Sequence, residues 1–272
     1  MNASTAGLPA ILLVGGGRMG SALLAGWRER GLSAAVVVDP SEAAGKLAAP
    51  GITVVPSFAS IPPGFAPEAV VLAVKPQMAA DALPAYARFA GRAVFISIMA
   101  GKTLHAIGAM LGVKASIVRA MPNTPAAVRQ GITVAVPGVH VTAHQKALAD
   151  TLLGATGQIS WVEDEGVLDP VTAISGGGPA YVFLLAELME QAGLDQGISP
   201  ELARQMARQT IIGSAALLAA SDEDAASLRI AVTSPKGTTE RALAVLRADD
   251  AWPKLFAEAI QAATERSREL SA

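Results

Sequence analysis

The chain has 272 residues, no cysteine, a hydrophobic fraction of 51% and a formal net charge of −2. This length suggests one large domain or two of moderate size, and the apolar content excludes a globally disordered chain. Without cysteine there is no disulfide framework, thiol nucleophile or cysteine zinc site, which fits a reducing compartment. No apolar run reads as a signal peptide or a membrane span, so we expect a cytoplasmic location. The balanced charge gives no electrostatic reason to expect a nucleic-acid partner.

Short β-branched runs alternate with helical stretches through the first half of the chain. Such apolar runs indicate strands buried on both faces, and their alternation with helices is typical of a doubly wound α/β fold with a parallel sheet. We expect a helix over 21–30. The expected strands are residues 11–14, 35–38, 52–55, 69–74, 93–98 and 116–119, and the runs at 132–136 and 159–162 are candidates to extend the sheet.

The composition changes after about residue 163, where Ala-, Leu- and Glu-rich segments predict an all-helical region. Ser199 followed by Pro200 has the pattern of a helix N-cap and first helical residue. The longest apolar run, residues 211–220, is about half the length of a membrane span, so we expect a buried helix face and no transmembrane helix. The alanine content of these helices suits close packing in an oligomer.

A glycine loop directly follows the first expected strand: Gly15, Gly16, Gly17, Arg18, Met19 and Gly20. Its G-x-G-x-x-G spacing is that of a dinucleotide-binding turn. In such a turn Gly15 permits the tight bend, Gly17 lets the backbone approach a pyrophosphate, and Gly20 lets the helix pack close to the strand. The helix N-terminus then offers free N–H groups to the phosphates. The alternative is a purely structural glycine turn.

Asp39 follows the second expected strand, where an acid can accept hydrogen bonds from the adenosine ribose of NAD and would repel a 2′-phosphate. Because Pro40 and Ser41 follow it, Asp39 also fits a turn or capping acid. We therefore expect NADPH or NADH as the cofactor, with Asp39 favouring NADH. Arg18 keeps NADPH open, since it could contact phosphate.

Two further motifs follow strands at the edge where doubly wound folds bind ligands. The sequence AVKP ends the fourth strand, and Lys75 within it points either towards that crevice or into solvent. The sequence RAMPNTP follows the sixth strand, and its two prolines hold Asn123 and Thr124 in a stiff loop. This loop is either part of a site or a structural turn.

The helical half contains two unusual segments. The run of glycines in SGGGPAY, residues 175–181, interrupts a helical stretch and lowers helix stability. Close approach of a ligand or of another helix to the backbone would explain why glycines are present there. The sequence TSPKGTT, residues 233–239, offers N–H groups and hydroxyls directly before a helix that begins near Glu240. These groups either bind a carboxylate or form a helix-capping turn. The 3 histidines lie outside every motif, so we expect no metal site, and we expect the acids at 163–165 and 222–224 to be solvated helix ends.

Taken in order, the glycine loop, AVKP, RAMPNTP, SGGGPAY and SPKGTT resemble the pyrroline-5-carboxylate reductase family, which catalyses the last step of proline synthesis. The resemblance covers nearly the whole chain. It implies a Rossmann-like domain over 1–162 and a helical substrate-binding and dimerisation domain over 163–272. It also implies hydride transfer from NADPH or NADH to a cyclic imine, giving L-proline. The family forms dimers that commonly assemble into a decamer, and each active site joins one subunit's cofactor to the partner's helical domain.

The resemblance implies residue roles. Thr239 and Lys75 are expected to be catalytic, with the Thr239 hydroxyl reaching the ring nitrogen. The substrate-binding residues are expected to be Ser234, Lys236, Gly237, Thr238, Thr239, Gly177 and Gly178. The cofactor-binding residues are expected to be Gly15, Gly17, Arg18, Met19, Gly20, Asp39, Ala73, Val74, Lys75, Pro76, Ala100, Gly101, Met121 and Asn123. Reduction of a cyclic imine depends more on alignment of the hydride donor with the imine carbon than on a strong acid. The reaction therefore suits a chain with no histidine in its motifs.

Several positions depart from the pattern of the family. Lys236 replaces a glycine of the usual SPGGTT, and it is strained there if the position needs a positive φ, or it adds a charge near the carboxylate. Gly177 replaces the serine of SGSGPAY, Met99 replaces an alanine, and Ile230 stands where an aspartate is common.

Three other functions compete with this assignment. The β-hydroxyacid dehydrogenases need a lysine on the first long helix after the Rossmann domain, but this chain has none between Lys146 and Lys236. A reductase for a larger imine ring, such as a piperideine carboxylate, is harder to distinguish from a pyrroline-5-carboxylate reductase by sequence. A dinucleotide-binding regulator without activity is the third, and it would bind cofactor without turnover.

Overall fold

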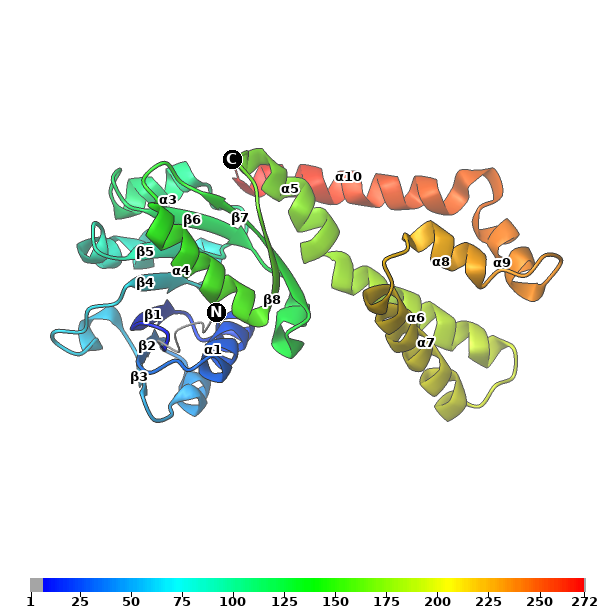
Figure 1. Ribbon diagram of the computed structural model, residues 1–272, viewed down its shortest axis with the longest axis horizontal. Coiled ribbons are helices and arrows are strands. Elements are labelled where there is room, and N and C mark those ends of the chain that lie inside the picture. The colour runs from blue at the N-terminus through cyan, green and yellow to red at the C-terminus, as the bar shows by residue number, and fades with distance from the viewer. Residues whose placement is uncertain (1–6, 272) are drawn as a thin grey trace. The chain divides into compact units, whose positions relative to one another are not determined.

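The computed structural model describes residues 7–271, which fold into two units (Figure 1). The first unit ends at Gly176 and takes up the chain again from Ala263, and the second runs from Gly177 to Ala262. An eight-stranded sheet with helices forms the first unit, and the regular elements of the second are all helical. The predicted fold class is therefore confirmed, whereas the boundary expected at residue 163 stays a prediction.

The sheet has the strand order β3-β2-β1-β4-β5-β6-β7-β8, and all neighbours are parallel except β6 and β7. A parallel crossover needs about a dozen residues or more, but the link from β6 to β7 holds only η5 (Thr124–Val128), so the chain turns back. Every predicted strand is present. Their bounds are β1 (Ile11–Val14), β2 (Ala35–Val38), β3 (Ile52–Val55), β4 (Ala69–Leu72), β5 (Val94–Ser97), β6 (Ile117–Met121), β7 (Gly131–Pro137) and β8 (Gly157–Trp161).

The α-helices are α1 (Arg18–Glu29), α2 (Ala79–Ala82), α3 (Leu104–Leu111), α4 (Ala143–Leu153), α5 (Leu168–Val171), α6 (Gly178–Asp195), α7 (Pro200–Ala220), α8 (Ala225–Ala231), α9 (Thr238–Leu246) and α10 (Ala251–Ser271). Helix α1 begins earlier than residue 21, because the end of the glycine loop is already helical. The N-cap predicted at Ser199 is confirmed, since its hydroxyl accepts a hydrogen bond from the Leu202 N–H.

Each face of the sheet has its own hydrophobic core, because side chains alternate along every strand. Ile11 and Leu13 of β1 face α1 and α4, and these two helices lie on the same side of the sheet in Figure 1. Leu12 and Val14 face the other core, which contains α3 and η4 (Leu83–Phe89). Burial on both faces explains why β1, β2 and β4 are unbroken apolar runs.

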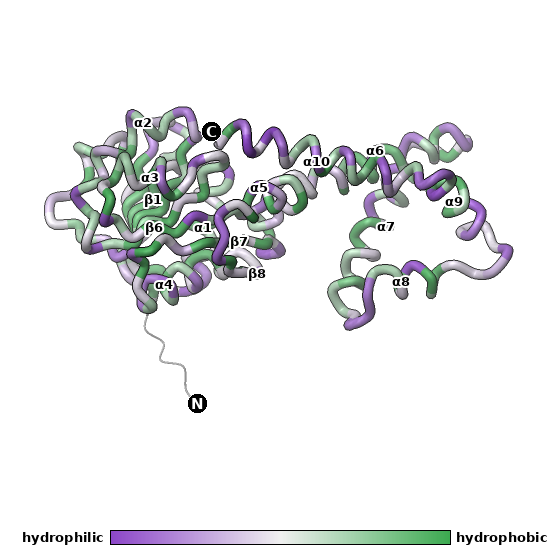
Figure 2. The backbone as a smooth tube through the Cα atoms, turned by 90° about the horizontal axis from the view of Figure 1, so that it is seen from above, coloured by the Kyte–Doolittle hydropathy of each residue, from purple (hydrophilic) through white to green (hydrophobic). Residues whose placement is uncertain are grey.

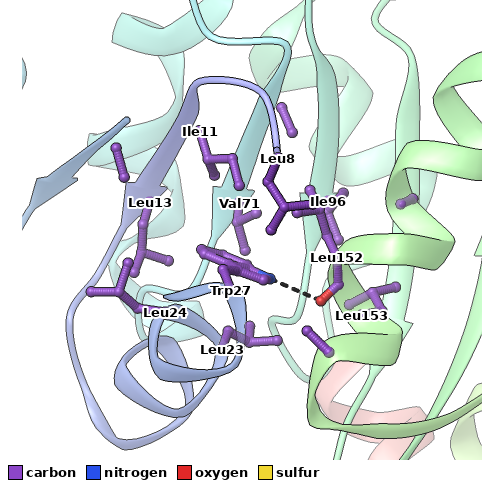
Figure 3. Packing of buried hydrophobic residues seen from close by; sticks show 14 of the residues in the cluster. Leu8, Ile11, Leu13, Leu23, Leu24, Trp27, Val71, Ile96, Leu152 and Leu153 are labelled. Atoms are coloured by element: carbon purple, nitrogen blue, oxygen red, sulfur yellow. Dashed lines mark hydrogen bonds between the residues drawn. The ribbon is translucent and has the colours of Figure 1, made fainter. Parts of the chain in front are cut away.

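Trp27 ties α1 to α4 in the first of these cores. Its ring is fully buried, and its Nε1–H donates a 2.8 Å hydrogen bond to the Leu152 carbonyl, as Figure 3 shows. The tryptophan therefore fills the space between the helices and also satisfies a backbone carbonyl at the end of α4. This packing fixes α1, whose first residues belong to the glycine loop.

Much apolar surface of the second unit stays exposed in the single chain. Figure 2 colours large parts of α6 and α7 as hydrophobic. Phe183 of α6 is 68% exposed and Leu217 of α7 is 66% exposed. The prediction that 211–220 is a buried helix face is thus wrong for one chain, because only Ala203 and Ala207 of α7 are buried. The helical stretch Glu165–Asp195 has the length and apolar composition of a membrane span, the single such case among residues 7–271.

Candidate active site

The glycine loop connects β1 to α1 at the carboxyl edge of the sheet. Gly15 has a φ of +101°, and a methyl group there would come within 2.5 Å of the Ala73 carbonyl oxygen. A methyl group at Gly20 would collide with the Gly15 carbonyl oxygen. Both positions therefore require glycine for the bend and the close helix, as expected from the spacing.

Gly17 differs from the other two glycines because nothing lies within 4 Å of the position that its Cβ would take. It is the N-cap of α1, where the first backbone N–H groups have no partner within the helix. Arg18 is exposed beside it, and Met19 is half-buried against the core below. Open space in front of unpaired N–H groups fits a pyrophosphate.

Asp39 lies beside the glycine loop, directly after β2. Its Oδ2 accepts a 2.7 Å hydrogen bond from the Gly16 N–H, and its Oδ1 accepts from the Ser41 N–H at 2.9 Å and hydroxyl at 2.6 Å. Burial alone would raise the pKa of Asp39, but the hydrogen bonds from Ser41 and Gly16 outweigh it and lower that pKa. Both carboxylate oxygens of Asp39 thus accept hydrogen bonds from nearby backbone N–H groups. This is the turn-stabilising role that the sequence analysis offered as an alternative to ribose binding.

The AVKP segment lies next to the glycine loop, as the close approach of Gly15 to Ala73 shows. Strand β4 ends at Leu72, and Val74 is half-buried while Lys75 is exposed at the N-cap of η3 (Pro76–Met78). Between β1 and β4 the strand order reverses, and doubly wound sheets bind their ligands at such a point.

The next two strands end at the same edge. After β5, Ala100 is exposed and Gly101 turns with a φ of +69°, where a methyl group would come within 2.8 Å of the Leu270 carbonyl oxygen. After β6, the Asn123 Oδ1 accepts a 2.9 Å hydrogen bond from the Ile132 N–H. The Met121 side chain lies against Gly176, where a methyl group would come within 2.7 Å of its Cε atom. The amide oxygen of Asn123 is therefore used to hold its own loop.

A buried ion pair below this loop was missed by the sequence analysis. Arg119 of β6 is 5% exposed, and its guanidinium donates a 2.7 Å hydrogen bond to Glu165 Oε1, which also accepts from the Leu104 N–H at 2.7 Å. The expectation that Glu165 is a solvated helix end is wrong, because it compensates a buried cation. No sequence signal distinguished Glu165 from its neighbours Glu163 and Asp164.

In the SGGGPAY segment, the helical stretch changes geometry. A π-helix, η8 (Thr172–Gly176), precedes α6, and Gly177 is the N-cap of that helix with Gly178 as its first residue. π-Helical turns often mark functional sites. The two units meet along the chain at this point, since the first ends at Gly176.

The SPKGTT segment forms a tight turn before α9. The Gly237 N–H donates a 3.0 Å hydrogen bond to the Ser234 carbonyl, Pro235 occupies the second position of the turn, and Lys236 occupies the third with a φ of +62°. A turn with a positive φ at its third position favours glycine, so lysine costs about 1 kcal/mol there. The predicted condition for strain at Lys236 is thereby met.

The residues after this turn begin α9. Thr238 and Thr239 are its first two residues, and both are exposed. Their N–H groups belong to the first turn, which has no intrahelical acceptors. Glu240 reaches back so that its Oε2 accepts a 2.8 Å hydrogen bond from the Lys236 N–H. An acid three residues after the N-cap is a capping signal that the sequence analysis did not use.

The candidate residues thus form two groups. The cofactor candidates gather along the carboxyl edge of the sheet in the first unit, and the SPKGTT turn lies in the second unit. Within residues 7–271 no three His, Asp or Glu side chains are placed to hold a metal ion.

The chain is similar to known proteins over nearly its whole length. A family model for pyrroline-5-carboxylate reductase dimerisation matches residues 165–270, and one for coenzyme F420-dependent NADP oxidoreductases matches residues 10–101. The pyrroline-5-carboxylate reductase of Pseudomonas aeruginosa is 39% identical over 97% of this chain and 97% of that protein. The chain belongs to the pyrroline-5-carboxylate reductase family. Its members are NAD(P)-dependent oxidoreductases, which confirms the resemblance and the enzyme class predicted from the motifs.

Solved structures of the family agree. A pyrroline-5-carboxylate reductase from Coxiella burnetii is 32% identical and superimposes with a TM-score of 0.88 over 97% of this chain and 99% of that one. The Plasmodium falciparum enzyme with NADP bound is 29% identical, with a TM-score of 0.83 over 97% and 98% of the chains. The region that matches the dimerisation model includes α6 and α7, whose apolar side chains are exposed in the single chain, and the protein is a homo-oligomer.

Proposed function

We propose that this member of the family reduces pyrroline-5-carboxylate to L-proline, with the cofactor bound at the carboxyl edge of the sheet and the substrate bound at the SPKGTT turn. The observation that carries this proposal is that the glycine loop and the SPKGTT turn both have the backbone geometry that ligand binding needs. The space beside Gly17 is open and leads to the first N–H groups of α1, and the positive-φ turn precedes the first N–H groups of α9. The proposed reaction is hydride transfer to a cyclic imine, and the bound reduced nicotinamide supplies that hydride.

The carboxyl edge of the sheet would bind the cofactor. Gly15, Gly17, Arg18, Met19 and Gly20 would hold the pyrophosphate, because the loop is bent, open and followed by a helix N-terminus. The remaining groups would line the nicotinamide side, with Lys75 adding a positive charge. They are Ala73, Val74, Lys75, Pro76, Ala100, Gly101, Met121 and Asn123.

The SPKGTT turn would bind the substrate. The N–H groups of Thr238 and Thr239, with the Ser234 hydroxyl, would hold the carboxylate, since they lie at the N-terminus of α9. Gly237 would keep the turn closed. The Thr239 hydroxyl would bond the ring nitrogen and hold its proton while the carbon accepts hydride. Gly177 and Gly178 would let the backbone approach the ring. We propose that these groups serve the cofactor bound by the partner subunit.

The preference between the two cofactors is a finer proposal. Asp39 accepts hydrogen bonds from Gly16 and Ser41, which fixes its carboxylate beside the loop and keeps it ionised. A fixed negative charge there would repel a 2′-phosphate, so we propose that NADH is preferred. A decameric assembly and a cytoplasmic location, expected from the sequence, stay predictions.

Steady-state reduction of pyrroline-5-carboxylate with NADH and with NADPH tests the proposal. We expect turnover with both and a higher kcat/KM with NADH. Thr239→Val keeps the shape of the side chain but removes the hydroxyl, so we expect kcat to fall about 10²-fold or more. The matched variant Thr239→Ser should retain most of the rate. Intact dinucleotide binding without turnover would contradict the proposed reaction and favour a regulator.

A further inference from the structure

The lysine in the substrate turn occupies a position where its backbone is unfavourable. Lys236 has a φ of +62° in the third position of the Ser234–Gly237 turn. Glycine adopts this conformation without steric cost, whereas a residue with a Cβ does not. Strain of this kind points to a function for the side chain when nothing in the fold needs it. The exposed side chain of Lys236 makes no packing contribution to the core and forms none of the ion pairs found among residues 7–271.

The backbone of Lys236 is held by a carboxylate. Glu240, in the first turn of α9, accepts a 2.8 Å hydrogen bond from the Lys236 N–H, which stabilises the turn and the start of the helix. The same carboxylate places a negative charge beside the N–H groups proposed to bind the substrate. Because the substrate is itself an anion, Glu240 repels it unless a cation compensates.

We propose that Lys236 is a specificity-determining residue whose ammonium group attracts the substrate carboxylate and offsets the charge of Glu240. Glu240 acts as a positioning residue that holds the turn. This inference rests on the proposed function of the turn and adds a side-chain charge to its backbone N–H groups. A lysine stem is long and flexible enough to reach the start of α9 from two residues away. Glu240 would then stabilise the start of α9, and the charge of Lys236 would prevent Glu240 from weakening substrate binding.

Four variants separate charge from backbone. Lys236→Met removes the ammonium and keeps the stem, and Lys236→Gly removes the ammonium and the strain together. Lys236→Arg is the matched control that keeps the charge. Glu240→Gln removes the negative charge but retains an oxygen that can accept the Lys236 N–H. Each variant is assayed with pyrroline-5-carboxylate and with 1-pyrroline, the same imine ring without the carboxylate, at low and high sodium chloride.

We expect Lys236→Met and Lys236→Gly each to raise KM for pyrroline-5-carboxylate by about two- to fivefold, as for an exposed charge pair, with kcat nearly unchanged. KM for 1-pyrroline should not change, and Lys236→Arg should resemble the wild type. The difference should shrink at high salt because exposed charges are screened. Adding Glu240→Gln to Lys236→Met should restore most of the lost affinity.

An unchanged KM for pyrroline-5-carboxylate in Lys236→Met, or an equal rise for both imines, would overturn the inference. So would a normal KM in Lys236→Gly together with a raised KM in Lys236→Met, since the effect would then come from the backbone. Failure of the wild type to reduce either imine would instead contradict the proposed function, so the two failures are distinguishable.

Discussion

Replacing Gly17 with alanine is expected to abolish most dinucleotide binding while leaving the fold intact. The space around its missing Cβ is empty to 4 Å, and its φ of −65° is accessible to alanine. We therefore expect the free energy of unfolding to change by less than about 1 kcal/mol. The added methyl group would stand where the pyrophosphate must approach the backbone. A loss of about tenfold or more in cofactor affinity follows, which is about 1.4 kcal/mol.

Gly20→Ala is the matched variant in the same loop. Its methyl group would collide with the Gly15 carbonyl oxygen and come within 3.2 Å of the Gly15 carbonyl carbon. These are backbone atoms that cannot rotate away, so overpacking should cost about 1–3 kcal/mol. Alanine gains about 1 kcal/mol in helix propensity, which offsets part of this cost. We expect Tm to fall by several degrees, at roughly 2–4 °C per kcal/mol.

Differential scanning fluorimetry of the protein without cofactor and calorimetric titration with NADH and NADPH separate the two effects. Gly17→Ala should keep its Tm and lose affinity, whereas Gly20→Ala should lose Tm. Wild-type affinity in Gly17→Ala would refute the assignment of the pyrophosphate to this loop. A large loss of Tm in that variant would show that the open space has a structural role.

Three further predictions concern stability and assembly. The pKa of Asp39 is lowered in the fold, so the advantage of wild type over Asp39→Asn should hold at pH 7 and decrease progressively as the pH falls below about 4, measured as Tm against pH. Trp27→Phe leaves the Leu152 carbonyl without its donor, and thermal unfolding should show a loss of about 1–3 kcal/mol. Phe183→Asp places a charge on the exposed face of α6 and should yield monomers by light scattering, whereas unchanged dimers would place the interface elsewhere.

The local signals for the sheet were strongest where a strand is buried on both faces, as in β1, β2 and β4, whereas β8 at the edge of the sheet alternates between half-buried and exposed residues. Runs such as 69–74 contain only apolar residues, so their position could be predicted from one sequence. The direction of β7 could not, since periodicity carries no information on strand direction. The shortness of the link after β6 gave a hint, but the ladder between Val118 and Pro137 decided it.

The candidate site, too, was predictable from the sequence only in part. Spacing alone predicted which glycines form the loop, because a tight turn before a helix needs glycine at fixed positions. Spacing did not show that the Asp39 carboxylate bonds to Gly16, nor that Arg119 meets Glu165, because these contacts join segments far apart in the chain. The position of Glu240, three residues after Gly237, is a capping signal in the sequence, but only the geometry of the turn showed that its carboxylate accepts the Lys236 N–H.

By itself, the sequence determined the strand and helix segments, the dinucleotide loop and the family, since these depend on local periodicity and ordered motifs. Only the tertiary structure decided the positive φ of Lys236, the hydrogen bonds that hold Asp39 and the exposure of the apolar face of α7. The physical reason is that burial and hydrogen-bond partners depend on which surfaces meet. Residues 211–220 illustrate it, because an apolar run predicts that a surface is covered but not whether the cover comes from its own chain.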